Sequence, residues 1–161
     1  MNEGQALIYW DSNVFLSYIN GIEERLPTID ALLEEASNED AAFLFTSTIS
    51  KVEVAYAASE QAKGKLDASV ESAIEHLWED YSVVKLVEFH DDIASIARDL
   101  LRYSIAQRWR LKPMDAIHLA SAKWMGADEF HTYDRPLEKY AGETGCKIIE
   151  PYVRQGRLPS I

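Results

Sequence analysis

The sequence is poor in cysteine, and this scarcity limits the kinds of site that it can build. Cys146 is the one cysteine in 161 residues, so an internal disulfide cannot form and a reducing compartment, the cytoplasm, is the expected location. No cysteines and histidines stand at the spacings of a zinc site. A metal ion bound by this chain is therefore expected to have oxygen ligands.

Long hydrophobic runs are also missing. The longest run near the start, Ala6–Trp10, covers five residues, whereas crossing a bilayer takes about 20. It has no basic flank or cleavage site, so it does not resemble a signal peptide. The chain contains no internal repeat and no linker rich in proline and glycine. We therefore expect no membrane association and a single domain over residues 1–161.

Positive charge is scarce, with 16 basic against 27 acidic residues and a net charge of −11. Such a chain does not attract nucleic acid through bulk charge. The charge is unevenly spread: residues 1–97 hold 5 basic and 19 acidic residues, whereas residues 98–161 hold 11 and 8. Either this is chance on solvated helix faces, or part of the surface tolerates a polyanion and the acidic part suits a basic partner.

Short apolar runs alternate with longer amphipathic ones. Strands are predicted at Ala6–Trp10, Phe43–Thr46, Val83–Val87, Glu129–Thr132 and Lys147–Glu150. Helices are predicted at Ile22–Ser37, Ile49–Gln61, Gly64–Tyr81, Asp92–Arg108 and Pro113–Met125, with Thr48 as an N-cap and Gly126 as a stop signal. This alternation predicts an α/β fold in which a parallel sheet of about five strands is sandwiched between helices.

Two aspartates stand where such a sheet places its functional sites, at the carboxyl ends of strands. Asp11 directly follows the first predicted strand, and Asp134 follows the fourth after one residue. Each also has an ordinary structural explanation as an N-cap or turn residue. Their common position predicts that both face the same crevice.

Two further acids lie on predicted helices with apolar surroundings. Glu53 stands between Val52 and Val54, and a carboxylate in such a run is either part of a solvated stripe or a buried group that needs a partner. Asp115 is the third residue of the helix that begins at Pro113, where an acid also favours the helix dipole. Together with Asp11 and Asp134, these acids would repel one another by roughly 4 kcal/mol per close pair, so a fold keeps them in one cleft only if a cation offsets the repulsion or some acids stay protonated. Mg²⁺ or Mn²⁺ suits such ligands.

The four acids occur in segments that resemble a known family. The segments are Ile8–Val14, Thr48–Glu53, Asp115–Ala122 and Thr132–Leu137. Over about Leu7 to Pro151 the chain resembles PIN domains, and more narrowly the VapC-type toxins of toxin–antitoxin pairs.

This resemblance implies a Mg²⁺- or Mn²⁺-dependent endoribonuclease of the PIN fold. It assigns metal-binding and catalytic roles to the four acids Asp11, Glu53, Asp115 and Asp134. It assigns a catalytic role, the orientation of water, to the hydroxyl of Thr132. It further implies an RNA substrate, an antitoxin partner and a homodimer.

Basic residues near these acids are candidates for binding RNA. Arg110 and Lys112 precede the helix that bears Asp115, and Arg135 follows Asp134, so each could contact a phosphate; ordinary solvated surface is the alternative. His118, one turn beyond Asp115, is interpreted as structural because an oxygen-ligand site needs no imidazole.

Two other classes of function remain open. Haloacid-dehalogenase-like phosphatases also begin with an aspartate after the first strand, but they carry a second aspartate two residues later, where this chain has Asn13. A PIN-fold binding module without catalytic activity is the other alternative, although all four acids are present. Metal binding and RNA cleavage distinguish the three.

Overall fold

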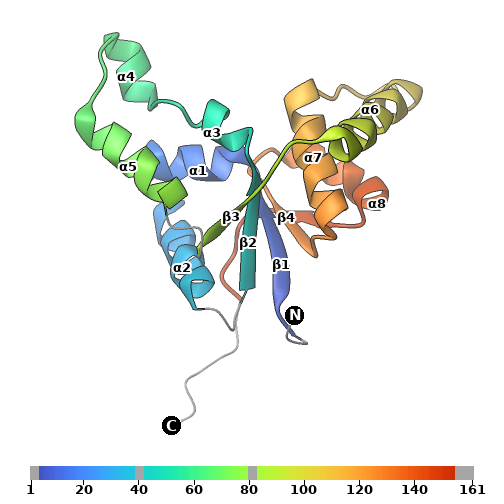
Figure 1. Ribbon diagram of the computed structural model, residues 1–161, viewed down its shortest axis with the longest axis horizontal. Helices are drawn as coiled ribbons and strands as arrows, with labels where there is room; N and C mark the ends of the chain where they lie inside the picture. The colour runs from blue at the N-terminus through green and yellow to red at the C-terminus, as the bar shows by residue number, and fades with distance from the viewer. Residues whose placement is uncertain (1–3, 39–41, 80–82, 155–161) are drawn as a thin grey trace.

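The computed structural model describes residues 4–38, 42–79 and 83–154, and its centre is a parallel sheet (Figure 1). The strands are β1 (Ala6–Trp10), β2 (Ala42–Ser47), β3 (Val84–Val87), β4 (Glu129–His131) and β5 (Lys147–Ile149). They lie in the order β3-β2-β1-β4-β5, and every neighbouring pair is parallel. The predicted α/β class and five-stranded sheet are confirmed.

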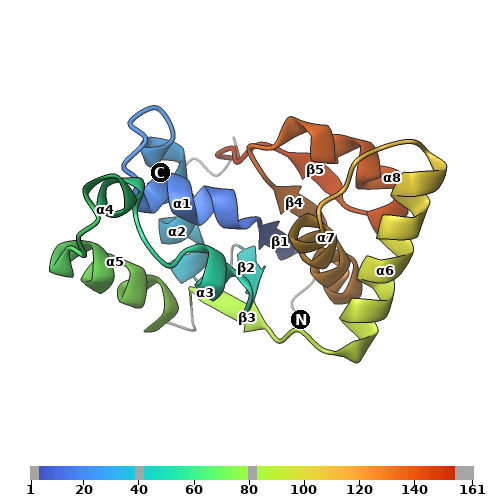
Figure 2. The same ribbon diagram turned by 90° about the horizontal axis from the view of Figure 1, so that it is seen from above.

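Alternating side chains of β1 face two separate cores. Ile8 and Trp10 pack against α1 (Ser12–Ile19), α2 (Leu26–Ser37) and α5 (Ala68–Glu79). Tyr9, between them, points to the opposite face and packs against α6 (Asp91–Ala106) and α7 (Pro113–Met125). Figure 2 shows the two helical layers on either side of the sheet. A parallel sheet needs both faces covered, and these helices supply the cover.

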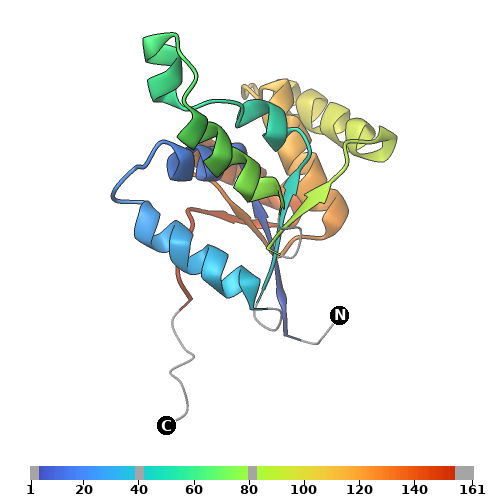
Figure 3. The same cartoon turned by 60° about the vertical axis from the view of Figure 1, so that its left-hand side comes forward.

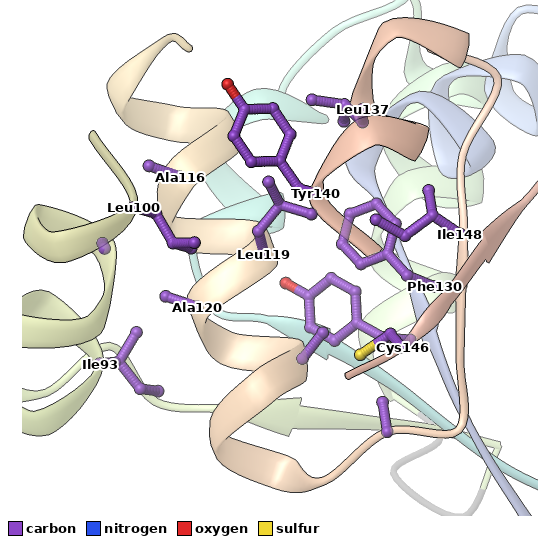
Figure 4. Packing of buried hydrophobic residues seen from close by; sticks show 14 of the residues in the cluster. Ile93, Leu100, Ala116, Leu119, Ala120, Phe130, Leu137, Tyr140, Cys146 and Ile148 are labelled. Carbon is purple, nitrogen blue, oxygen red and sulfur yellow. The ribbon is translucent and has the colours of Figure 1, made fainter. Parts of the chain in front are cut away.

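Small side chains let α7 lie close to both the sheet and α6. Ala116, Leu119 and Ala120 are fully buried, and in Figure 4 they lie between Ile93 and Leu100 of α6 on one side and the sheet on the other. Phe130 of β4 completes this cluster from the sheet. The first turn of α7 is thereby held against the carboxyl end of the sheet.

The predicted helix Ile49–Gln61 is wrong as a single element. It consists of α3 (Ser50–Glu53) and α4 (Ala58–Lys63), which are separated because Ala57 adopts an extended conformation. The Glu60 carboxylate accepts a hydrogen bond from the Ala57 N–H at 3.0 Å and starts α4 as a new helix. Thr48 is not the N-cap of α3: Ile49 occupies that position without a side-chain hydrogen bond.

Other helix limits differ less. Helix α7 and its end at Gly126, which has a φ of 68°, are as predicted. Helix α2 begins at Leu26 rather than Ile22, and α5 begins at Ala68 rather than Gly64; the predicted end of α5 at Tyr81 lies outside the described residues. Three elements were not predicted: the helix α1, the 3₁₀ helix η1 (Arg135–Tyr140) and the helix α8 (Ala141–Thr144).

The chain order places a topological switch point beside β1. From β1 the chain moves outward through β2 and β3, whereas β4 and β5 lie on the other side of β1, so the order reverses between β1 and β4. Ligands of such sheets bind beyond the carboxyl ends of the strands at this reversal. Among the described residues, no helix is long and apolar enough to cross a membrane.

Candidate metal centre and active site

Asp11 lies at the reversal point, at the end of the central strand. Its N–H donates to the carbonyl of His131 at 3.0 Å, which continues the pairing of β1 with β4 by one residue. Its Oδ1 accepts from the Ser12 N–H at 2.8 Å, so Asp11 is also the N-cap of α1. The residue is 2% exposed. Burial raises the pKa of the Asp11 carboxyl above its ordinary value, and the negative charge of Glu53 raises it further.

The Thr132 hydroxyl joins Asp11 to the segment that carries Asp134. It donates to Asp11 Oδ2 at 2.9 Å and accepts from the Asp134 N–H at 3.0 Å. Asn13 reinforces this link: its side-chain amide donates to Thr132 Oγ1 at 2.9 Å and to Asp11 Oδ2 at 3.2 Å. Its Oδ1 accepts from the Tyr133 N–H at 3.1 Å. Residues 120 positions apart are thus held together at the ends of β1 and β4.

Asp115 brings a third carboxylate to the same place from the first turn of α7. Partial burial raises the pKa of Asp115 to about 6, and the negative charges of Asp11 and Asp134 contribute to that rise. The positive charge of Lys112 acts in the opposite direction. Asp115 therefore lies within the electrostatic field of both other acids.

His118 links Glu53 to Asp11. The Nε2 atom of His118 lies 2.5 Å from Glu53 Oε1 and 3.7 Å from Asp11 Oδ1. Burial lowers the pKa of His118, but the hydrogen bond to Glu53 and the charge of Asp11 outweigh burial and leave the pKa above its ordinary value. His118 is fully buried, as expected of a structural residue, and it also contacts the candidate site.

The oxygen atoms of the four carboxylates are the kind of ligand that a hard divalent cation prefers. Within residues 4–38, 42–79 and 83–154, however, no three carboxylate, imidazole or thiol side chains are grouped closely enough to hold one metal ion. The four acids share one neighbourhood without forming a preformed cage. Burial is the largest cause of the raised pKa of Asp115, and the repulsion by Asp11 and Asp134 that adds to it is what a cation would relieve.

Residues 8–143 match the family model of the PIN domain. The chain belongs to the PIN domain family. No curated protein matches the chain. The family model covers all four acids and the sheet as far as β4.

Solved structures share this PIN fold at low sequence identity. The chain is similar to a chain of VapBC2 from Rickettsia felis, bound to a promoter DNA fragment, with a TM-score of 0.69 and 14% identity over 91% of this chain and 99% of that one. It is similar to a chain of FitAcB from Neisseria gonorrhoeae, with a TM-score of 0.60 and 18% identity over 89% and 97%. It is also similar to a chain of a toxin–antitoxin complex from Klebsiella pneumoniae, with a TM-score of 0.56 and 22% identity over 93% of this chain and 100% of that one.

The three predicted substrate-binding residues of this PIN domain are all exposed. Arg110 and Lys112 are exposed in the connection between α6 and α7, and Lys112 is close enough to influence Asp115. Arg135 is also exposed, and its Nε donates to Glu150 at 3.1 Å. These assignments stay predictions.

Sequence reasoning missed several residues around the acids of the PIN domain. The Arg25 guanidinium stacks 3.8 Å above the ring centroid of Tyr133, the residue before Asp134. It is an isolated cation in an acidic stretch, and nothing in the sequence indicates this contact. Asn13 was compared with the phosphatase motif alone, although a polar residue two positions after a strand-end acid is well placed to bind that acid.

Proposed function

We propose that this PIN domain is a Mg²⁺- or Mn²⁺-dependent endoribonuclease of the cytoplasm and the toxin of a type II toxin–antitoxin pair. The observation that supports it is the position of Asp115, whose pKa is raised to about 6 by burial and by the charges of Asp11 and Asp134. A fold retains such repulsion where a cation offsets it. Family membership supports the nuclease class.

In this proposal each residue has a distinct task. Asp11, Glu53, Asp115 and Asp134 would hold the ion, and Thr132 would keep Asp11 and the Asp134 backbone in register. The bound ion supplies positive charge that stabilises the phosphodiester in its transition state. A carboxylate of this group accepts a proton from the attacking water, and Arg110, Lys112 and Arg135 hold the RNA backbone.

The test is RNA cleavage by the purified protein with Mn²⁺ or Mg²⁺ and with a chelator. Asp115→Asn removes the charge at the centre of the group and keeps its volume. We expect it to abolish metal-dependent cleavage and to leave the far-ultraviolet circular dichroism spectrum unchanged. Asp99→Asn, an exposed acid on α6, is the matched control and should cleave at the wild-type rate.

Each alternative has its own result. Full cleavage by Asp115→Asn would contradict the assignment of the site. Hydrolysis of a phosphomonoester without RNase activity would favour a phosphatase, and absence of metal binding in the wild type would favour a PIN-fold module that only binds.

The partners are part of the proposal. Two of the similar solved structures are VapBC2 and a toxin–antitoxin complex, which supports an antitoxin partner, and we propose a homodimer on the resemblance alone. Light scattering on the purified protein tests the homodimer, and a monomer at all concentrations would contradict it. A small DNA-binding protein encoded beside this chain would support the antitoxin.

A further inference from the structure

A buried line of polar groups runs behind Glu53. The Ser47 N–H at the end of β2 donates to the Tyr9 hydroxyl at 3.0 Å. That hydroxyl lies 2.7 Å from His118 Nδ1, and His118 Nε2 lies 2.5 Å from Glu53 Oε1. Tyr9 and His118 have no exposed surface. The line therefore connects β2, β1 and α7 through buried groups and reaches solvent only at Glu53 of α3, whose side chain is 24% exposed.

The roles of donor and acceptor follow from the groups themselves. The Glu53 carboxylate can only accept, so His118 Nε2 carries the hydrogen. Ser47 N–H can only donate, so Tyr9 Oη accepts there; Tyr9 then donates to His118 Nδ1 when the imidazole is neutral and accepts from it when the imidazole is protonated. Both ring nitrogens are then occupied, and the imidazole is fixed with Nε2 toward Glu53. With both nitrogens engaged, His118 has no lone pair left for a metal ion.

Glu53 needs such support because its own helix holds it weakly. Helix α3 spans four residues and ends at Glu53, and the preceding Val52 is 72% exposed. Helices this short contribute little stability of their own. Asp11, in contrast, has hydrogen bonds from Ser12, Thr132 and Asn13. The contact with His118 ties Glu53 to α7, which is buried at Ala116 and from His118 to Ala122.

We propose that His118, oriented by Tyr9, is a positioning residue that holds the Glu53 carboxylate beside Asp11 for metal binding. The inference rests on the proposed function, because it assumes that the four acids bind the ion. The location of His118 explains why a histidine suits this position: Nε2 also lies 3.7 Å from Asp11 Oδ1, so one N–H faces two carboxylates. Groups that orient metal ligands in this way typically contribute about 10- to 100-fold to metal affinity.

Two substitutions of His118 separate positioning from simple filling of space. In His118→Gln the longer side chain places its amide N–H near the position of Nε2, so the bond to Glu53 is kept. In His118→Asn the shorter amide lies near the position of Nδ1 and does not reach Glu53. We expect Mn²⁺ affinity, measured by isothermal titration calorimetry, to fall about 10- to 100-fold in His118→Asn and to remain within a few-fold of wild type in His118→Gln.

Tyr9→Phe provides a second test of the inference, and a substitution of the exposed His76 provides the control. Tyr9→Phe removes one oxygen and frees the imidazole to turn, so Mn²⁺ affinity should fall several-fold. His76→Asn, on the exposed face of α5, should leave affinity unchanged. In metal-free protein, amide exchange at Glu53 and Val54, whose N–H groups bond within α3, should accelerate in His118→Asn but not in His118→Gln.

The outcomes are distinguishable. If the wild type binds no Mn²⁺, the proposed function fails, while the exchange experiment still tests whether His118 holds α3. If the wild type binds Mn²⁺ and His118→Asn and Tyr9→Phe bind it equally well, the inference is wrong. Equal weakening in His118→Gln and His118→Asn would also contradict it, because a merely structural role predicts no rescue. If His118→Asn does not fold, unchanged Mn²⁺ affinity in Tyr9→Phe overturns the inference, and weakened affinity supports it.

Discussion

At the scale of single residues, Thr132 has three hydrogen-bond partners for one hydroxyl. It donates to Asp11 Oδ2 and accepts from Asn13 Nδ2 and the Asp134 N–H, all between 2.9 and 3.0 Å. The residue is 2% exposed, so water cannot take over these bonds. A valine has the same shape and none of these bonds.

Thr132→Val should therefore destabilise the protein by about 1–3 kcal/mol, because it leaves three polar partners without their shared hydroxyl. Thr132→Ser keeps the oxygen and should cost less than about 1 kcal/mol. Urea unfolding of the two variants and the wild type measures the difference. Equal loss in Val and Ser would indicate that the methyl group, not the hydroxyl, matters.

The raised pKa of Asp115 predicts how stability depends on pH. An ordinary aspartate in the unfolded chain titrates near 3.8, whereas Asp115 in the folded protein titrates at about 6. Between these values the folded state binds more protons, so the free energy of unfolding falls as pH rises from 4 to 6. The half-buried side chain is partly screened by solvent, and we expect its share of the fall to be about 1 kcal/mol.

Thermal unfolding of metal-free protein from pH 4 to pH 6 measures this slope, and Asp115→Asn should make it shallower. Asp11, whose pKa is also raised, contributes a slope of the same sign that remains in the variant. An identical slope in wild type and variant would show that Asp115 is not the titrating group.

The four acids were recognisable in the sequence because each stands in a pattern of its own, at a strand end or within an apolar helix. Their supports were not, because Asn13 and Thr132 are 119 positions apart and become partners only through the pairing of β1 with β4. The same holds for Tyr9 and His118, which β1 and α7 bring within 2.7 Å. Sequence patterns indicate which elements form, and contacts across elements depend on how they pack.

At the scale of elements, the segment from α3 to α5 departs most from the predicted structure. Figure 3 shows α4 projecting beyond the body of the molecule. An amphipathic pattern predicts helix through this region, but it cannot show the break at Ala57. Glu60 explains the break, since its Oε1 accepts from the Ala57 N–H and its Oε2 accepts from the Asp67 N–H at 2.8 Å. One buried carboxylate thus fixes both the start of α4 and the turn before α5.

Glu60→Ala should leave those two backbone donors without a partner and lower the free energy of unfolding by about 1–3 kcal/mol. The effect should be local: hydrogen exchange at Ala57 and Asp67 should accelerate, with little change in the sheet. Glu75→Ala, an exposed acid in the middle of α5, is the control. Uniform acceleration across the sheet would contradict a local role.

At the scale of the whole molecule, the uneven charge of the sequence becomes a spatial asymmetry. Figure 2 shows α1–α5 on one side of β1 and α6, α7 and α8 on the other, so the strongly acidic part of the chain and the slightly basic part lie on different sides of the candidate site. The boundary at residue 97 falls within α6. An RNA that reaches the acids is expected to approach from the side of the α6–α7 connection, where Arg110 and Lys112 are exposed.

This direction of approach predicts a specific salt dependence. Joint substitution of Arg110 and Lys112 by alanine should lower kcat/KM for RNA about tenfold at 0.15 M salt. It should also reduce the slope of log kcat/KM against log salt concentration by about 1 to 2, because each lost phosphate contact removes about one unit of slope. Arg98→Ala with Lys123→Ala, on the two helices that this connection joins, changes the net charge equally and is the matched control. A local contact makes the two double variants differ, because bulk charge alone would affect both alike. Equal slopes in the two would mean that RNA reaches the carboxylates across another surface, with Arg25 beside Tyr133 the next cation to substitute.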